Sequence, residues 1–93
     1  MIEVQYYTDR KSGCTENERS RILKYMQSGK GFCAAPSIRT DIVSGEPLPV
    51  YDFDLTDGKY LWNSAATYYF EKYDFDLSDE FKKHVLSLRG GVN

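Results

Sequence analysis

The sequence predicts a single α+β domain over residues 1–93, in which a mostly antiparallel sheet is covered on one face by about three helices. Three observations lead to this fold class. The chain of 93 residues is long enough for one core and too short for two. Apolar residues make up 41% of it, which is too many for a disordered protein. Segments with the two-residue period of strands alternate with segments in which apolar residues recur at helical spacing.

The first strand is expected at residues 2–7. Apolar side chains occupy every second position there, at Ile2, Val4 and Tyr6, which is typical of a half-buried strand. Residues 8–13 are polar, and we expect them to form a loop.

The first helix is expected to begin at Thr15 and to extend toward Gly29. Thr15 and Glu18 have the spacing of a capping box, in which each side chain bonds to the backbone amide of the other residue. Gly29 is expected to end the helix with a positive φ. The buried stripe is predicted to contain Ile22, Leu23, Tyr25 and Met26.

Three extended segments are predicted next, at residues 32–35, 38–43 and 48–55. Proline and glycine separate them, so they are expected to form a meander. Alternation in the third segment predicts one apolar and one solvated sheet face. The apolar face would carry Tyr51, Phe53 and Leu55, and the other face Val50, Asp52 and Asp54.

A hairpin and two helices complete the expected fold. Asp57-Gly58 predicts a tight turn into a strand over residues 59–62, because glycine accepts the positive φ that such turns need. Asn63 or Ser64 is expected to cap a helix over residues 64–73. Ser78 is expected to cap the last helix, which Gly90-Gly91 would end. The inner faces are predicted to contain Ala66, Tyr69, Phe70 and Tyr73 in one helix, and Phe81, His84, Val85 and Leu88 in the other.

Charge and composition argue against several classes of protein. Twelve Lys and Arg against 14 Asp and Glu give a net charge of −2, which lacks the basic excess that nucleic-acid binding requires. No apolar run is long enough for a signal peptide or a membrane span, so we expect a cytoplasmic protein with no membrane partner. Residues 41–93 carry ten acidic and five basic side chains, which favours a basic partner and is equally typical of a solubilising surface.

Asp52, Asp54 and Asp57 form the most suggestive group of carboxylates. If Asp52 opened a calcium loop, glycine would stand at position 57 and glutamate at 63, but the sequence has Asp57 and Asn63. His84 is the only histidine, so no two-histidine metal site or acid–base pair can be built. We therefore assign no catalytic residue, metal ligand or cofactor from the sequence.

Part of the chain resembles a family of small, mostly uncharacterised bacterial cytosolic proteins. The matching pattern is Thr56-Asp57-Gly58 followed by Trp62, then Tyr68-Tyr69, Lys72-Tyr73 and Leu77, and a helix with Phe81 and His84. Residues 22–29 are similar to that family's opening helix. Ser78 stands where many relatives have proline, and the first fifteen residues have no counterpart. The resemblance implies an immunity-like or accessory protein of a bacterial toxin system.

The leading interpretation is a non-enzymatic protein-binding module, in the form of an immunity-type inhibitor that holds a basic toxin or effector. Tyrosine is a favoured anchor in protein interfaces, and carboxylates would steer a basic partner. Two alternatives remain open: a small metal-dependent enzyme that uses the aspartates, and a structural subunit of a larger assembly. The oligomeric state is not predicted. The residues expected to contact the partner are Asp52, Asp54, Asp57, Tyr60 and Tyr68.

Overall fold

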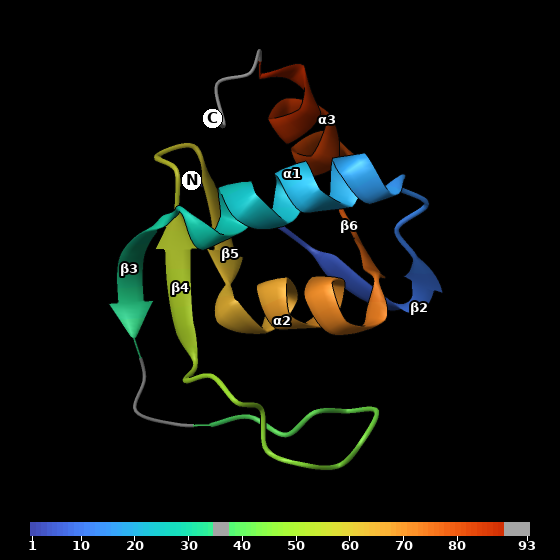
Figure 1. The fold of residues 1–93 in the computed structure, drawn as a ribbon. Coiled ribbons are helices and arrows are strands. Elements are labelled where there is room, and N and C mark those ends of the chain that lie inside the picture. Colours follow the sequence, from blue (N-terminus) through green and yellow to red (C-terminus); the bar gives the residue numbers. More distant parts are fainter. Residues whose placement is uncertain (35–37, 89–93) are drawn as a thin grey trace.

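A computed structural model of the protein describes residues 1–34 and 38–88 (Figure 1). Within these ranges the chain forms three helices and six strands. In chain order they are β1 (Ile2–Glu3), β2 (Tyr6–Lys11), α1 (Glu16–Gln27), β3 (Lys30–Ala34), β4 (Phe53–Thr56), β5 (Tyr60–Asn63), α2 (Ser64–Tyr73), β6 (Phe75–Leu77) and α3 (Asp79–Ser87).

The strands form two sheets, and the predicted α+β class is confirmed. The larger sheet has the order β1-β5-β4-β3, in which β1 and β5 are parallel and the other two pairings are antiparallel. The smaller sheet pairs β2 with β6 in antiparallel orientation. Figure 1 shows the two sheets at opposite ends of the helices, with α1 and α2 running between them.

The division into two sheets has its origin in the N-terminal segment, where one strand was expected. The amide of Val4 donates to the Leu61 carbonyl of β5 at 2.8 Å, whereas the Gln5 carbonyl accepts from the amide of Ser78 at 3.0 Å. The chain therefore leaves one sheet and enters the other between Val4 and Gln5. Residues 8–11, expected in a loop, continue β2 beside β6.

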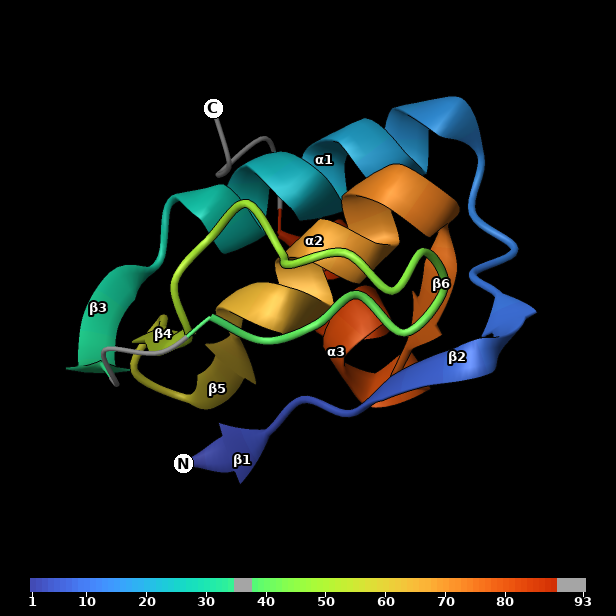
Figure 2. The same ribbon diagram turned by 90° about the horizontal axis from the view of Figure 1, so that it is seen from below.

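The predicted meander is wrong in its middle part. Residues 38–52 form a long loop with one isolated bridge between Thr40 and Pro47, in place of the strand expected over 38–43 and of the first five residues of the one expected over 48–55. The Asp41 side chain accepts from the amides of Val43 and Ser44 at 2.8 and 3.2 Å, which turns the chain locally. These side-chain hydrogen bonds replace those of a strand ladder. Figure 2 shows this 38–52 loop running across α2.

The capping box of α1 is confirmed, but its C-terminus differs from the prediction. The amide of Glu18 donates to Thr15 Oγ1 at 3.2 Å, and the Thr15 amide donates to Glu18 Oε1 at 2.8 Å. Ser28 is the C-cap, and Gly29 has no positive φ. A Cβ at Gly29 would lie 2.5 Å from Cζ2 of Trp62, so glycine is needed there for close approach to the indole ring.

The predicted hairpin is confirmed. Of the last two helices, α2 has a side-chain cap and α3 does not. Gly58 has a φ of +100° in the turn between β4 and β5. Asn63 Oδ1 accepts from the amide of Ala65 at 2.8 Å and caps α2. Ser78 stands at the N-cap of α3, but its side chain makes no capping bond. The expected helix end at Gly90-Gly91 lies outside the described residues.

Two clusters of buried side chains form the core. The smaller cluster, of Leu48, Ala65 and Tyr69, joins the 38–52 loop to α2. The larger cluster lies between the helices and both sheets. It contains Val4, Ile22, Met26, Tyr60, Trp62, Ala66, Phe70, Leu77, Phe81 and Val85.

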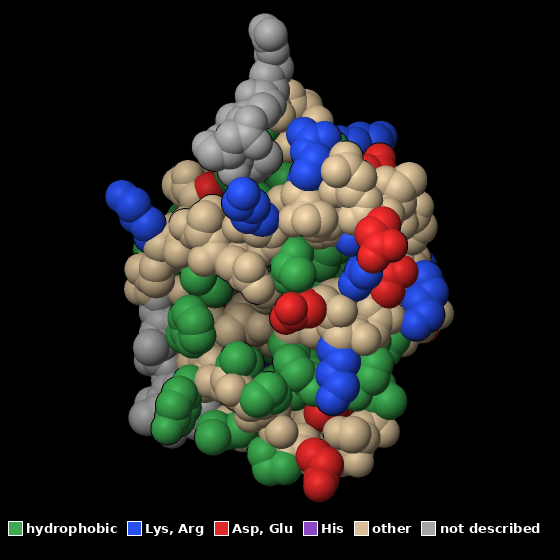
Figure 3. Space-filling model, in the orientation of Figure 1, with side chains coloured by type: hydrophobic (Ala, Val, Ile, Leu, Met, Phe, Trp, Pro, Cys, Tyr) green, Lys and Arg blue, Asp and Glu red, His purple; other side chains and the backbone are tan. Residues whose placement is uncertain are grey.

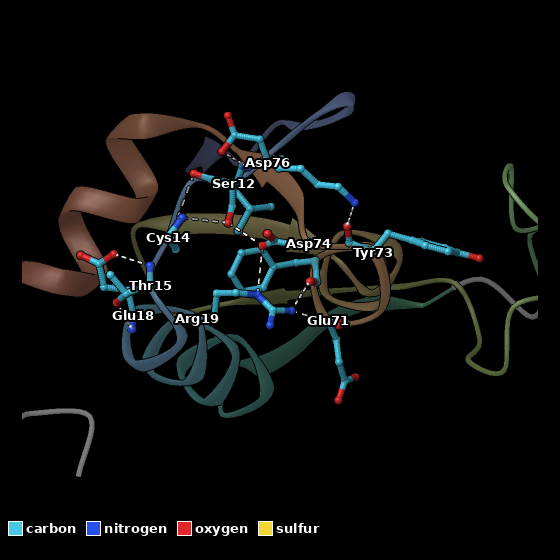
Figure 4. A network of polar contacts seen from close by, with 12 residues as sticks. Ser12, Cys14, Thr15, Glu18, Arg19, Glu71, Tyr73, Asp74 and Asp76 are labelled. Carbon is cyan, nitrogen blue, oxygen red and sulfur yellow. Dashed lines mark hydrogen bonds and ion pairs between the residues drawn. The ribbon is translucent and has the colours of Figure 1, made fainter.

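A polar junction holds the start of α1 against the end of α2 (Figure 4). Asp74 accepts from Ser12 Oγ at 2.5 Å and forms an ion pair with Arg19 at 2.9 Å. The Arg19 guanidinium also donates to the carbonyl oxygens of Phe70 and Glu71, both at 3.1 Å. One arginine therefore neutralises a carboxylate and binds two carbonyls at the C-terminal end of α2.

Candidate functional site

The five residues expected to contact a partner lie in three separate places. Asp52 and Asp54 are near one another because both accept from Nδ2 of Asn63, at 2.6 and 3.0 Å. Asp52 also pairs with Arg39 at 3.2 Å. The Asn63 hydrogen bond, together with Arg39, holds the pKa of Asp52 below its usual range although burial opposes the shift. These carboxylates are already bound within the chain.

Asp57 organises the β4–β5 turn. Its Oδ1 accepts from the amides of Lys59 and Tyr60 at 2.9 and 2.7 Å. Its Oδ2 accepts from the Tyr25 hydroxyl and lies 3.4 Å from His84 Nε2. Burial alone would raise the pKa of Asp57, but these hydrogen bonds outweigh it and the pKa is lowered. The side chain is 12% exposed, so its role in the described structure is to hold the turn against α1 and α3.

The placement of Tyr60 corrects the expectation that it contacts a partner. The residue is only 2% exposed and packs against Phe81, with ring centroids 5.4 Å apart. Its hydroxyl donates to Glu80 at 2.9 Å, and burial followed by this hydrogen bond raises the pKa of Tyr60. Tyr60 was expected beside the carboxylates on the solvated side of the sheet, whereas Phe81 of α3 packs against it.

Tyr68 belongs to a cluster that sequence analysis did not find. Its hydroxyl donates to Asp41 Oδ2 at 2.6 Å, and the hydroxyl of Tyr73 donates to the same oxygen at 2.7 Å. The Tyr69 hydroxyl lies nearby, where it accepts from the amide of Ile42 at 3.1 Å. Three tyrosines of α2 therefore bind the 38–52 loop, and we call Asp41, Tyr68, Tyr69 and Tyr73 the tyrosine latch.

The latch keeps a nearly inaccessible carboxylate ionised. Asp41 is 1% exposed, and burial alone would raise its pKa. Hydrogen bonds from Tyr68, Tyr73 and two backbone amides outweigh burial and place the pKa well below its usual range. The same carboxylate raises the pKa of Tyr68 and of Tyr73. In the sequence, the three tyrosines stand within two turns of one predicted helix, but no local pattern connects them with Asp41.

An open groove lies between α2 and the 38–52 loop, and we call it the α2 groove. Its volume is about 890 Å³, and most of its surface is apolar. Figure 3 shows hydrophobic side chains gathered over α2 and the loop, in the lower half of that face. The loop contributes Ser44, Glu46, Pro47, Pro49 and Val50, α2 contributes Ser64, Thr67, Tyr68, Glu71 and Lys72, and the end of α1 and β4 contribute Met26, Gln27, Phe53 and Leu55.

Exposed apolar side chains extend this surface along the loop. Large hydrophobic side chains are seldom left in water in such number on one short segment. Those of the loop are Ile38, Ile42, Val43 and Tyr51, which are 51%, 64%, 56% and 64% exposed.

The charged side chains among the described residues that line the α2 groove are Glu46, Glu71 and Lys72. Glu46 and Glu71 form no ion pair among the described residues. The Lys72 ammonium lies 5.6 and 5.5 Å from the ring centroids of Tyr68 and Tyr73, within the range of cation–π attraction. Two carboxylates and one ammonium leave the lining with a net negative charge.

Within residues 1–34 and 38–88, no group of three or more His, Cys, Asp or Glu side chains is arranged to hold a metal ion. The helices of this part of the chain are all too short or too polar to cross a membrane. No protein-family model matches the sequence, and comparisons with curated proteins and with solved structures find no match.

Proposed function

We propose that the protein is a non-enzymatic binding module that holds another protein in the α2 groove. The observation that carries this proposal is the groove itself, an open apolar hollow that continues into exposed hydrophobic side chains of the adjoining loop. Apolar patches of this kind mark protein interaction sites. Tyr68 is the one residue expected at the interface that lines this groove.

The tyrosine latch supports the proposal because it fixes one wall of the groove before any partner arrives. The loop is bound to α2 through Asp41, whose hydrogen bonds to Tyr68 and Tyr73 are 2.6 and 2.7 Å long. A loop ordered in the free protein need not be ordered during binding, so less conformational entropy is lost.

The specific form that we propose is an immunity-type inhibitor that occupies a basic toxin or effector, as the family resemblance implies. The acidic second half of the chain would speed the approach of such a partner. We therefore expect raised salt to slow association more than it speeds dissociation, as measured by stopped-flow or surface plasmon resonance. An association rate independent of salt would contradict the electrostatic part of the proposal.

Photo-crosslinking tests the groove directly. A photoreactive amino acid in place of Pro49, an exposed lining residue, is expected to form an adduct with one protein in the cell that produces this chain. The same amino acid in place of Asp9, exposed on β2, serves as the control and should give no such adduct.

The captured protein is then purified and titrated calorimetrically. Pro49→Arg places a long charged side chain in the groove and should weaken binding at least about tenfold, a loss of roughly 1.4 kcal/mol. Asp9→Asn should leave the affinity unchanged. Equal binding by the native chain and Pro49→Arg, with both folded by circular dichroism, would contradict the proposal.

A further inference from the structure

We infer that the α2 groove accepts an amphipathic helix of the partner, with an apolar face toward the groove and a Lys or Arg beside Glu46 and Glu71. This inference rests on the proposed function and names the chemistry of the partner at the same site.

The groove offers no strand edge to an extended segment. An extended peptide that binds by strand addition pairs its backbone N–H and C=O groups with a free strand edge. Among the described residues, the only strand that lines the groove is β4, which is already paired with β3 on one side and β5 on the other. The other walls are helix and loop, which favours an occupant that satisfies its own backbone, as a helix does.

The apolar lining selects the face that the occupant presents. Val50 and Pro49 project from the loop, and Phe53 and Leu55 lie on β4. Apolar side chains at successive turns of a helix could pack along such a surface, which is how amphipathic helices bind hydrophobic grooves. Ile42 and Val43, exposed on the same loop, extend the surface beyond the groove.

The net negative charge of the groove lining favours a cationic side chain on the occupant. Glu46 and Glu71 lie on the loop and on α2, and neither pairs with a cation among the described residues. Lys72, the one cation among the lining residues that the structure describes, lies against the rings of Tyr68 and Tyr73. The ionised Asp41 behind Tyr68 adds to the negative potential. A Lys or Arg at the edge of an apolar helix face complements these charges.

Three labelled helical peptides of equal length test this inference by fluorescence anisotropy at low salt. The first has a leucine face flanked by lysines, the second a leucine face flanked by glutamates, and the third a serine face flanked by lysines. The first is expected to bind the native chain most tightly, and Pro49→Arg should weaken it.

Two charge variants are expected to change the affinity for the leucine–lysine peptide in opposite directions. Glu71→Gln should weaken it about two- to fivefold, and Lys72→Gln should strengthen it by about the same factor, since exposed charge pairs contribute modestly. Glu16→Gln, exposed in the first turn of α1, is the matched control and should change nothing. A general loss of structure would lower the affinity of both groove variants for the peptide, so it could not produce a gain in one variant and a loss in the other.

Two results would overturn the inference. One is binding of the leucine–glutamate peptide as tight as or tighter than that of the leucine–lysine peptide, which would exclude the proposed cation. The other is that neither leucine-faced peptide binds in a way that Pro49→Arg weakens. The proposed function is decided separately, by the captured partner and its response to Pro49→Arg.

Discussion

Asp41 connects the local sequence of the 38–52 loop with the shape of the α2 groove. It is 1% exposed and accepts four hydrogen bonds, from two tyrosine hydroxyls and two backbone amides. A buried carboxylate with so many donors is far more stable ionised than protonated. We therefore expect the charge of Asp41 to contribute to the stability of the loop.

Asp41→Asn should destabilise the protein at neutral pH, because an amide accepts weaker hydrogen bonds from Tyr68 and Tyr73 than a carboxylate does. The pKa of Asp41 is lowered by folding, so its contribution is complete above the unfolded value of about 3.9 and is lost as pH falls below it. In urea unfolding, the free energy of unfolding of the native chain should exceed that of the variant by the largest amount near pH 7. The difference should be smaller near pH 3.

Asp9 is exposed on β2, and Asp9→Asn is the control for this measurement. Its free energy of unfolding should change with pH in the same way as that of the native chain. A gap between the native chain and Asp41→Asn that stays constant with pH would show that the charge of Asp41 does not stabilise the loop.

At the scale of elements, Gly29 determines how closely the end of α1 approaches β5. A Cβ there would lie 2.5 Å from Trp62 Cζ2 and 3.2 Å from Leu55 Cβ. Gly29→Ala should therefore lower the free energy of unfolding by about 1–3 kcal/mol, the range for overpacking. Gly31→Ala is the matched control, because no atom lies within 4 Å of its added methyl group. Equal effects in thermal melting would contradict this account of the contact.

The helix caps give a second comparison between two similar residues. Thr15→Ala removes the hydroxyl that accepts from the Glu18 amide, which is one half of the α1 capping box, and should lower stability by about 1 kcal/mol. Ser78→Ala should have little effect, because the Ser78 side chain makes no bond to α3. Urea denaturation distinguishes the two variants, and a larger loss from Ser78→Ala would contradict the observed cap geometry.

The elements that the sequence predicts well are those with local signals. Thr15 and Glu18 mark the start of α1, Asp57-Gly58 marks the hairpin, and Asn63 caps α2. The turn at Asp41 was missed because apolar residues of the loop resemble a strand. Tyr60 was misplaced because only the tertiary packing of α3 buries it.

At the scale of the whole molecule, the two sheets and the α2 groove depend on contacts between distant segments. The pairing of β1 with β5 and of β2 with β6 joins residues more than fifty positions apart. The tyrosine latch joins residues 27 and 32 positions apart. No periodicity within a short window contains such information, so the fold class could be predicted and the candidate site could not.

The carboxylates that the sequence made prominent form hydrogen bonds within the fold, and the interaction surface that we propose lies elsewhere. Asp52 and Asp54 share the Asn63 amide, and Asp57 holds its turn. Folding leaves large apolar side chains of the 38–52 loop exposed beside the apolar lining of the α2 groove. We propose that the protein binds its partner through this surface.

Heteronuclear NMR of the native chain, titrated with the partner captured through position 49, tests this claim most directly. We predict that the largest amide shifts fall in α2 and the 38–52 loop, at residues such as Ser44, Glu46 and Glu71. Shifts centred on Asp52, Asp54 and Asp57, with α2 unchanged, would contradict it.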